Sequence, residues 1–489
     1  MSCDPRIVTL FVYIAIYPAP SLQESPSHPS DPESLLDSSH TYLAMRVTTP
    51  DPSRLTATQA LALIRSNDLT VESYARSLLS RIESRDEAVK AWAYLNPESV
   101  LKQARKLDAV PLENRGPLHG LPIGVKDVIY TKDMATEHNS PLYKDSHVPV
   151  DAAPVAMLRA AGALIFGKTT TTEFASTTNG PATYNPHDRT RTPGGSSSGS
   201  GAAVADYQIP IALGTQTGGS TIRPGSFNGI YAVKPTWGAV SREGLKVYSL
   251  ILDTLGVFAR GVEDLELILE VLGVADDATG GSVGFDGVQG AKFGLVKTSV
   301  WPQAGPGTIA AMDKAATILR SHGAIVGELE LPPEFNNMPA WHAAIMAADA
   351  RTSFISEYRR DKSKISKHLT GYIENKEGYT RAQYIAALDG IASLRPRIDE
   401  IAGRYAALLT PSVPDEAPVG IQETGSAAFC SMWTALHTPV VNIPSFQGEN
   451  GLPIGVSLVA PRFSDQHLLT VAKEVGGLFK EEGGWKSSL

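Results

Sequence analysis

Two serines and one lysine are the residues whose types and surroundings could together attack a carbonyl group. Ser196 and Ser220 lie in glycine-rich stretches, and Lys126 follows a short apolar run further upstream. Serine is a poor nucleophile until a base removes its proton. Lysine can be that base when burial keeps it neutral. A buried lysine more often forms an ion pair, here with Asp127, so both interpretations stay open on spacing alone.

The segment Thr217-Gly218-Gly219-Ser220 has the composition of an oxyanion hole. Two adjacent glycines allow a tight turn whose N–H groups converge on one point. A serine at the edge of that turn could attack a carbonyl held there. The chain has no G-x-S-x-G elbow, so a triad of the α/β-hydrolase type is not indicated.

Residues 194–201 form a Gly/Ser run that would ordinarily indicate a flexible linker. Here Pro193 precedes the run and Ala202-Ala203-Val204-Ala205 follows it as the expected start of a helix. A glycine-rich loop before a helix can also bind phosphate. No lysine follows these glycines as a P-loop requires, so phosphate binding is the weaker interpretation.

Several motifs taken together closely resemble the amidase signature family. The resemblance spans roughly residues 55–480, and its motifs follow one another in the family's order. It implies a single α/β/α domain around a mixed central sheet and a Ser-cisSer-Lys triad. The stretches that carry it are residues 116–127, 193–200, 214–220, 233–236, 406–412 and 450–461.

The resemblance assigns a role to each candidate residue. Ser220 would be the nucleophile, and neutral Lys126 would be the base. Ser196, after a cis peptide from Gly195, would relay the proton between them, and Ser197 would support the lysine by hydrogen bonding. The oxyanion hole would consist of the N–H groups of Thr217, Gly218, Gly219 and Ser220.

The chain departs from the family's common pattern at three places near these residues. Gln216 stands where many members have aspartate, and Arg223 follows the nucleophile by three residues rather than two. Ser197-Ser198-Gly199 replaces a Ser-Ser-Gly-Gly stretch. None of these changes removes a triad member, and we expect Arg223 to support the loop rather than meet substrate.

Composition excludes several classes of protein. The chain has 489 residues, of which 42% are hydrophobic and 19% charged, so it can bury a sizeable core. Its net charge of −8 argues against a nucleic-acid surface. The two cysteines cannot make a disulfide framework, and Cys430 lies in an apolar context that predicts packing. The eleven histidines show no metal-ligand spacing, so we expect no metal and no cofactor.

The first 53 residues differ from the rest of the chain. Residues 18–53 are rich in Pro, Ser and Asp, so we expect residues 1–53 to be a disordered or weakly docked extension. The apolar run 7–17 is too short to span a bilayer, and although it could be a signal-peptide core, we favour a cytoplasmic protein. A chain that begins at Ser53 is expected to fold and to keep most of its activity.

From residue 54 to 489, strand-like and helical segments alternate, which indicates a sheet covered on both faces. We expect one large domain. The strands are expected at 121–125, 163–166, 293–296, 324–326, 407–409 and 455–459, and the helices from 56, from 68, at 153–161, at 308–321 and within 337–400. Six apolar side chains in variable segments are best explained as core, although as a group they suggest an apolar pocket: Trp301, Trp341, Met346, Phe429, Met432 and Trp433.

The leading hypothesis is an enzyme that hydrolyses a small-molecule carboxylic amide and forms an acyl-enzyme on Ser220. A homodimer is possible. The alternative is an amidotransferase A subunit that makes ammonia from glutamine for a partner enzyme, although Gln216 and the position of Arg223 argue against it. A non-catalytic scaffold is the third hypothesis, and an intact triad argues strongly against that.

Overall fold

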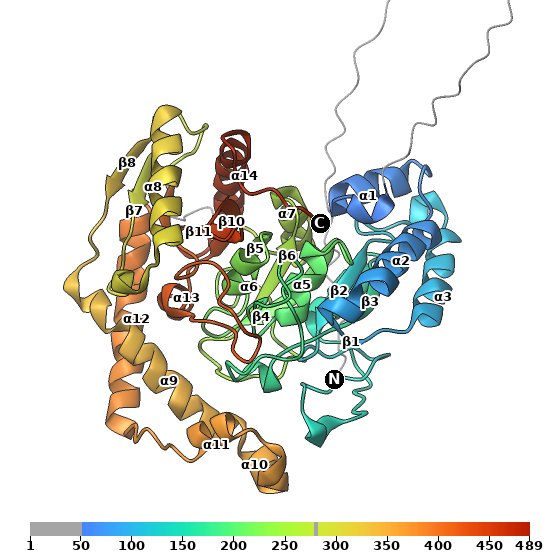
Figure 1. Cartoon of the computed structure of the whole chain (residues 1–489), viewed down its shortest axis with the longest axis horizontal. Helices are drawn as coiled ribbons and strands as arrows, with labels where there is room; N and C mark the ends of the chain where they lie inside the picture. Colours follow the sequence, from blue (N-terminus) through green and yellow to red (C-terminus); the bar gives the residue numbers. More distant parts are fainter. Residues whose placement is uncertain (1–50, 278–281) are drawn as a thin grey trace, which may run out of the picture. The chain divides into compact units, whose positions relative to one another are not determined.

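The computed structural model describes residues 51–277 and 282–489, so the apolar run 7–17 and nearly all of the expected extension lie outside the described residues. In this part of the chain, eleven strands form one sheet (Figure 1). In sheet order they are β1 (Trp92–Tyr94), β3 (Leu164–Thr169), β2 (Pro122–Lys126), β4 (Ile211–Gln216), β6 (Thr254–Ala259), β5 (Tyr231–Lys234), β10 (Val440–Gln447), β11 (Pro453–Val459), β9 (Ala407–Pro411), β7 (Lys292–Leu295) and β8 (Ile325–Glu328).

The sheet is mixed, as the family resemblance implied. Strand β2 runs parallel to both β3 and β4, and β7 runs parallel to both β8 and β9. The strands from β4 through β6, β5, β10 and β11 to β9 pair antiparallel. Central strands such as β2, β3 and β4 are buried along their whole length because helices cover both faces.

Helices flank the sheet and complete the three layers. Those of the described residues are α1 (Ala57–Arg65), α2 (Val71–Val89), α3 (Pro97–Asp108), α4 (Ala153–Ala160), α5 (Ser198–Ala205), α6 (Ile222–Phe227), α7 (Val262–Val271), α8 (Pro306–Ser321), α9 (Met338–Ser353), α10 (Ile355–Asp361), α11 (Lys367–Ile373), α12 (Arg381–Ala402), α13 (Ala428–Ala435) and α14 (Asp465–Glu481).

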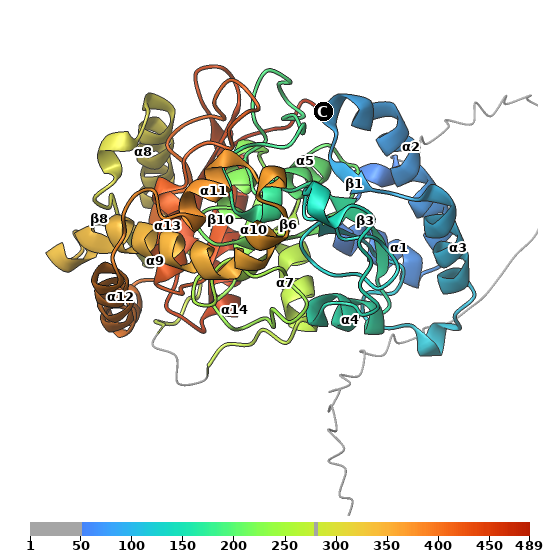
Figure 2. The same ribbon diagram turned by 90° about the horizontal axis from the view of Figure 1, so that it is seen from below.

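Alternation along β3 shows how the two apolar faces are built. Ile165 packs into the cluster that includes α4, α7, α8 and α14, of which α4, α7 and α14 lie along the lower edge in Figure 2. Leu164 and Phe166 point to the opposite face and pack with α2, α3 and α5. Further along the sheet, α9, α12 and α13 form a third apolar cluster.

Local sequence signals account for several element boundaries. Thr56 and Gln59 form the capping box that starts α1. The expected helix after the Gly/Ser run does form, but the expected start at Ala202 is wrong, because α5 begins at Ser198 inside the run. All of α5 is buried, and a Cβ on Gly199 would lie 2.2 Å from the carbonyl oxygen of Ala91. Small residues are therefore needed there for close packing.

No helix among residues 51–277 and 282–489 combines the length and the hydropathy that crossing a bilayer requires.

Candidate active site

Lys126 ends β2 in the interior of the protein. Its side chain is fully buried, and its ammonium nitrogen Nζ donates to Ser196 Oγ at 2.7 Å and to Thr215 Oγ1 at 2.8 Å. The alternative ion pair with Asp127 does not form: Asp127 pairs instead with Lys168, at 3.2 Å. Among the described residues, no carboxylate lies within 4.0 Å of the Lys126 nitrogen. A buried lysine held only by hydroxyl groups can lose its proton at low cost.

Burial is the main influence on the protonation of Lys126, and it favours the neutral amine. Burial holds the pKa of Lys126 well below its usual value, and the guanidinium of Arg223 lowers that pKa further. The carboxylate of Asp253 opposes both effects. Arg223 is itself buried, and this burial lowers its pKa to about 10.

Ser196 lies in the loop that leads from Pro193 into α5. The peptide bond between Gly195 and Ser196 is cis, as the family resemblance implied. The position predicted for Ser197 needs a correction, because its hydroxyl does not contact the lysine. Ser197 Oγ instead donates to the Thr215 carbonyl at 3.2 Å and accepts from the Thr215 N–H at 3.3 Å. Its support for Lys126 passes through Thr215.

Ser220 lies in the tight connection between β4 and α6. It keeps 8% of its surface exposed, so it is both largely buried and reachable. Within the described part of the chain, no group accepts a hydrogen bond from the N–H of Gly218, Gly219 or Ser220. Unpaired N–H groups beside a reachable serine are the feature an oxyanion hole requires.

Thr217, the first residue of this turn, is held at two points. Its hydroxyl donates to Asp253 Oδ1 at 2.6 Å, and its carbonyl accepts from His342 Nε2 at 2.9 Å. Because a carbonyl can only accept, the imidazole must carry its proton on Nε2. Burial lowers the pKa of His342, which favours this neutral form.

Gln216 shows why the chain tolerates an amide where many members have a carboxylate. Its side-chain oxygen accepts from the N–H groups of Thr221 and Ile222, at 2.9 and 3.0 Å, and so caps the start of α6. Its amide nitrogen donates to Thr434 Oγ1 at 3.0 Å, and that hydroxyl lies 2.6 Å from the carbonyl oxygen of Gly218. The amide thus orients a hydroxyl that holds the glycine turn.

Arg223 supports the loops, as expected from the sequence. Its guanidinium donates to the Gly195 carbonyl at 2.6 Å, to the Gly425 carbonyl at 2.5 Å and to Thr424 Oγ1 at 3.1 Å. It therefore ties the loop that carries Ser196 to residues 424–425.

Sequence reasoning missed Thr215, Asp253 and His342. A signal for Thr215 was present, since neighbouring residues of a strand point to opposite faces: Thr215 contacts Lys126, whereas the side chain of Gln216 contacts Thr434. Asp253 directly precedes β6 and His342 lies on α9, and no local motif indicates either residue.

The apolar residues considered for a substrate pocket lie mostly in the core. Phe429, Met432 and Trp433 are buried on α13, and Trp341 and Met346 pack against the same cluster. Cys430 is buried as predicted, its thiol donates to the Ser412 carbonyl, and burial raises its pKa to about 12.

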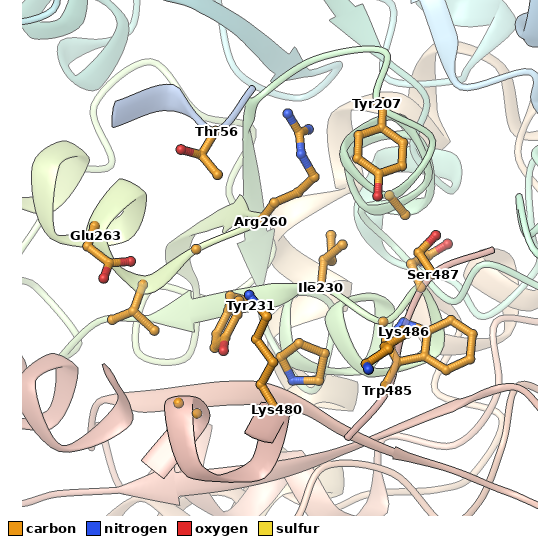
Figure 3. A pocket seen from close by; sticks show the side chains of 18 of the residues that line it. Thr56, Tyr207, Ile230, Tyr231, Arg260, Glu263, Lys480, Trp485, Lys486 and Ser487 are labelled. Atoms are coloured by element: carbon orange, nitrogen blue, oxygen red, sulfur yellow. The ribbon is translucent and has the colours of Figure 1, made fainter. Parts of the chain in front are cut away.

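A cavity of about 500 Å³ lies at a different place on the protein (Figure 3). Tyr231, Arg260, Lys480 and Trp485 are among the residues that line it, and none of the candidate catalytic residues does. A much smaller cavity, about 10 Å³, is lined by Thr215, Thr217 and Asp253. Within residues 51–277 and 282–489, no three His, Cys, Asp or Glu side chains gather as metal ligands would.

Comparisons with known proteins identify the family of the chain. The family model described as Amidase matches residues 74–469. The A subunit of glutamyl-tRNA(Gln) amidotransferase from Symbiobacterium thermophilum is 33% identical over 468 residues, which cover 86% of this chain and 95% of that protein. Two solved structures are similar. The A subunit of glutamyl-tRNA(Gln) amidotransferase from Thermotoga maritima has a TM-score of 0.73 and 26% identity, covering 87% of this chain and 95% of that one. The peptide amidase of Stenotrophomonas maltophilia has a TM-score of 0.72 and 27% identity, covering 87% and 97%.

Proposed function

The chain belongs to the amidase family of hydrolases that act on carbon–nitrogen bonds, and we propose that it cleaves a carboxylic amide through an acyl-enzyme on Ser220. One observation carries the proposal. A fully buried lysine with no carboxylate partner among the described residues donates to Ser196 Oγ at 2.7 Å and to Thr215 Oγ1 at 2.8 Å, and Thr215 lies three positions before the Gly-Gly-Ser turn. That arrangement supports a base and a relay beside β4, the strand that leads into the turn of the proposed oxyanion site.

The proposed reaction begins when Ser220 Oγ attacks the amide carbonyl carbon. Its proton passes to Ser196 Oγ, and the proton of Ser196 passes to the neutral Lys126 amine. The N–H groups of the glycine turn stabilise the negative oxygen of the tetrahedral intermediate. When the carbon–nitrogen bond breaks, the relay returns a proton to the leaving ammonia or amine, and an ester on Ser220 remains. Water then attacks that ester, and the carboxylate is released.

A panel of aryl and alkyl amides tests the proposal. The wild-type protein should release a carboxylate and ammonia or an amine in equal amounts from at least one member of the panel. The Ser220→Ala variant should fold and lose that turnover by a factor on the order of 10³ or more. Turnover of the same amide at the wild-type rate by Ser220→Ala would refute the assignment of the nucleophile.

A second candidate function is the ammonia-producing component of an amidotransferase. Its support is the similarity, over 86% of this chain, to proteins named as the A subunit of glutamyl-tRNA(Gln) amidotransferase. Such a component would use the same Ser220 chemistry on glutamine and would work with a partner enzyme. A glutaminase assay, with and without proteins that co-purify with the chain, separates it from a stand-alone amidase.

Each function predicts a different result from those assays. A stand-alone amidase should hydrolyse its best amide without a partner and show little preference for glutamine. An amidotransferase component should prefer glutamine and gain activity in a stable complex. Size-exclusion chromatography with light scattering would show whether the purified chain is the homodimer that we considered. Cell fractionation would test the expected cytoplasmic location.

A further inference from the structure

Asp253 is a buried carboxylate beside the site to which the proposed mechanism gives no role. It directly precedes β6, which pairs with β4 in antiparallel register, with Gln216 opposite Thr254. The next opposed pair along this register is Thr217 with Asp253. Strand β4, which carries Thr215 to Lys126, therefore also sets the position of Asp253 through its pairing with β6.

The carboxylate is fixed by hydrogen bonds at both oxygens. Oδ1 accepts from the Thr217 hydroxyl at 2.6 Å, and Oδ2 accepts from the N–H groups of Tyr248 and Ser249 at 2.7 and 3.2 Å. Asp253 keeps only 7% of its surface exposed. Three donors around a buried carboxylate make it a rigid anchor for the first residue of the glycine turn.

We propose that Asp253 is a positioning residue for this amidase site: its carboxylate anchors Thr217, and its negative charge acts on Lys126. This inference rests on the proposed function. The anchor keeps the N–H groups of Gly218, Gly219 and Ser220 at the oxyanion position. The negative charge raises the pKa of Lys126 and so opposes the effect of burial, which lowers that pKa.

The charges that face these two groups set the direction of the expected effect. Lys126 faces Asp253, which raises the pKa of the lysine, and Arg223, which lowers it. Burial raises the pKa of Asp253 to about 6, and Arg242 lowers that pKa. Tyr248 also lies near the carboxylate, and burial raises the pKa of its phenol. Above pH 6 the carboxylate is charged, so removing that charge must lower the pKa of Lys126 further.

The test compares the pH dependence of kcat/KM in two variants. In Asp253→Asn, the acid limb of the profile should move to lower pH by about one unit, the size expected for losing a nearby opposite charge. Its kcat should also fall, because an amide cannot accept from Thr217 and from both N–H groups at once. In Thr217→Val, the charge stays and only the anchoring hydroxyl goes. Its kcat should fall while the acid limb stays at the wild-type pH.

Asp465 offers a matched control. It is also buried, and its carboxylate accepts from the hydroxyl and the N–H of Thr236 at 2.6 and 2.8 Å, but the lysine that it faces is Lys234 rather than Lys126. Asp465→Asn should lower stability without moving the acid limb.

An acid limb in Asp253→Asn that stays at the wild-type pH would overturn the inference, as would an equal shift in Asp465→Asn. Either result is distinguishable from failure of the proposed function. That function fails if the wild-type protein cleaves no amide of the panel or if Ser220→Ala keeps its turnover, whereas the inference fails with Ser220 still essential.

Discussion

Lys126 and Ser196 are joined by a hydrogen bond of 2.7 Å although 70 positions separate them in the chain. Strand β2 delivers the lysine, and the loop before α5 delivers the serine. Thr215 holds the lysine from a third element, β4. The contact depends on three separate parts of the fold, so substitutions at either residue report on the assembled site.

The lysine should be essential as a base. Lys126→Arg replaces the amine by a permanently charged guanidinium, which cannot give up its proton at any working pH. We expect turnover to fall by a factor on the order of 10³. Circular dichroism should confirm that the variant folds. Substantial turnover in Lys126→Arg, with an unchanged pH profile, would contradict the role of base.

The pH dependence of the wild-type enzyme follows from the same residue. Because burial lowers the pKa of Lys126, the neutral amine forms well below the usual lysine pKa of about 10.4. Only the neutral form accepts a proton, so kcat/KM should rise as pH increases through that lowered pKa. A profile that falls over this range, measured on one amide, would oppose the account.

Ser196 should matter for chemistry more than for folding. Ser196→Ala removes the relay between Lys126 and Ser220, so kcat should fall by about 10²-fold or more. Ser198→Ala, at the first residue of α5, is the matched control. Its hydroxyl donates to the Gly194 carbonyl at 2.8 Å, and its loss should cost about 1 kcal/mol of stability without a comparable loss of turnover. Equal turnover in both variants would show that no relay is needed.

The amide of Gln216 should be needed in this chain even though a carboxylate is common at that position in the family. In Gln216→Glu, the capping oxygen remains but the donor to Thr434 is lost. The new carboxylate would draw the Thr434 hydroxyl away from the Gly218 carbonyl. We expect kcat to fall about tenfold, the equivalent of one hydrogen bond of about 1.4 kcal/mol. In Thr434→Val, kcat should fall by a similar factor. Full activity in both variants would show that the hydrogen bonds among Gln216, Thr434 and Gly218 do not support the glycine turn.

We expect that the beginning of the chain can be shortened with small effect. A chain starting at Thr49 keeps Asp51, whose carboxylate accepts from the Ser53 N–H at 3.0 Å and the Ser77 hydroxyl at 2.9 Å. It should match the full chain in melting temperature and specific activity. A chain starting at Ser53 loses those two bonds and should melt a few degrees lower. A drop of many degrees in the Thr49 chain would show that the preceding residues pack on the enzyme.

The sequence alone could propose the parts of the candidate site that lie in contiguous motifs. Ser196, Ser220 and the glycine turn each occur in a stretch whose composition already restricts its geometry. Alternating strand-like and helical segments likewise predicted a sheet covered on both faces, and the family resemblance implied that it is mixed. Asp253 could not be found this way, because its place beside Thr217 depends on the register between β4 and β6. The contact of Ser197 was missed for a similar reason, since Thr215 lies between its hydroxyl and the lysine.

Covalent trapping of the nucleophile tests the central claim most directly. The protein would be treated with a fluorophosphonate reagent, digested, and mapped by peptide mass spectrometry. We predict a single adduct on Ser220, absent in Ser220→Ala and formed more slowly in Ser196→Ala and Lys126→Arg. An adduct on another residue, in a Ser220→Ala variant that still hydrolyses the amide, would contradict the account.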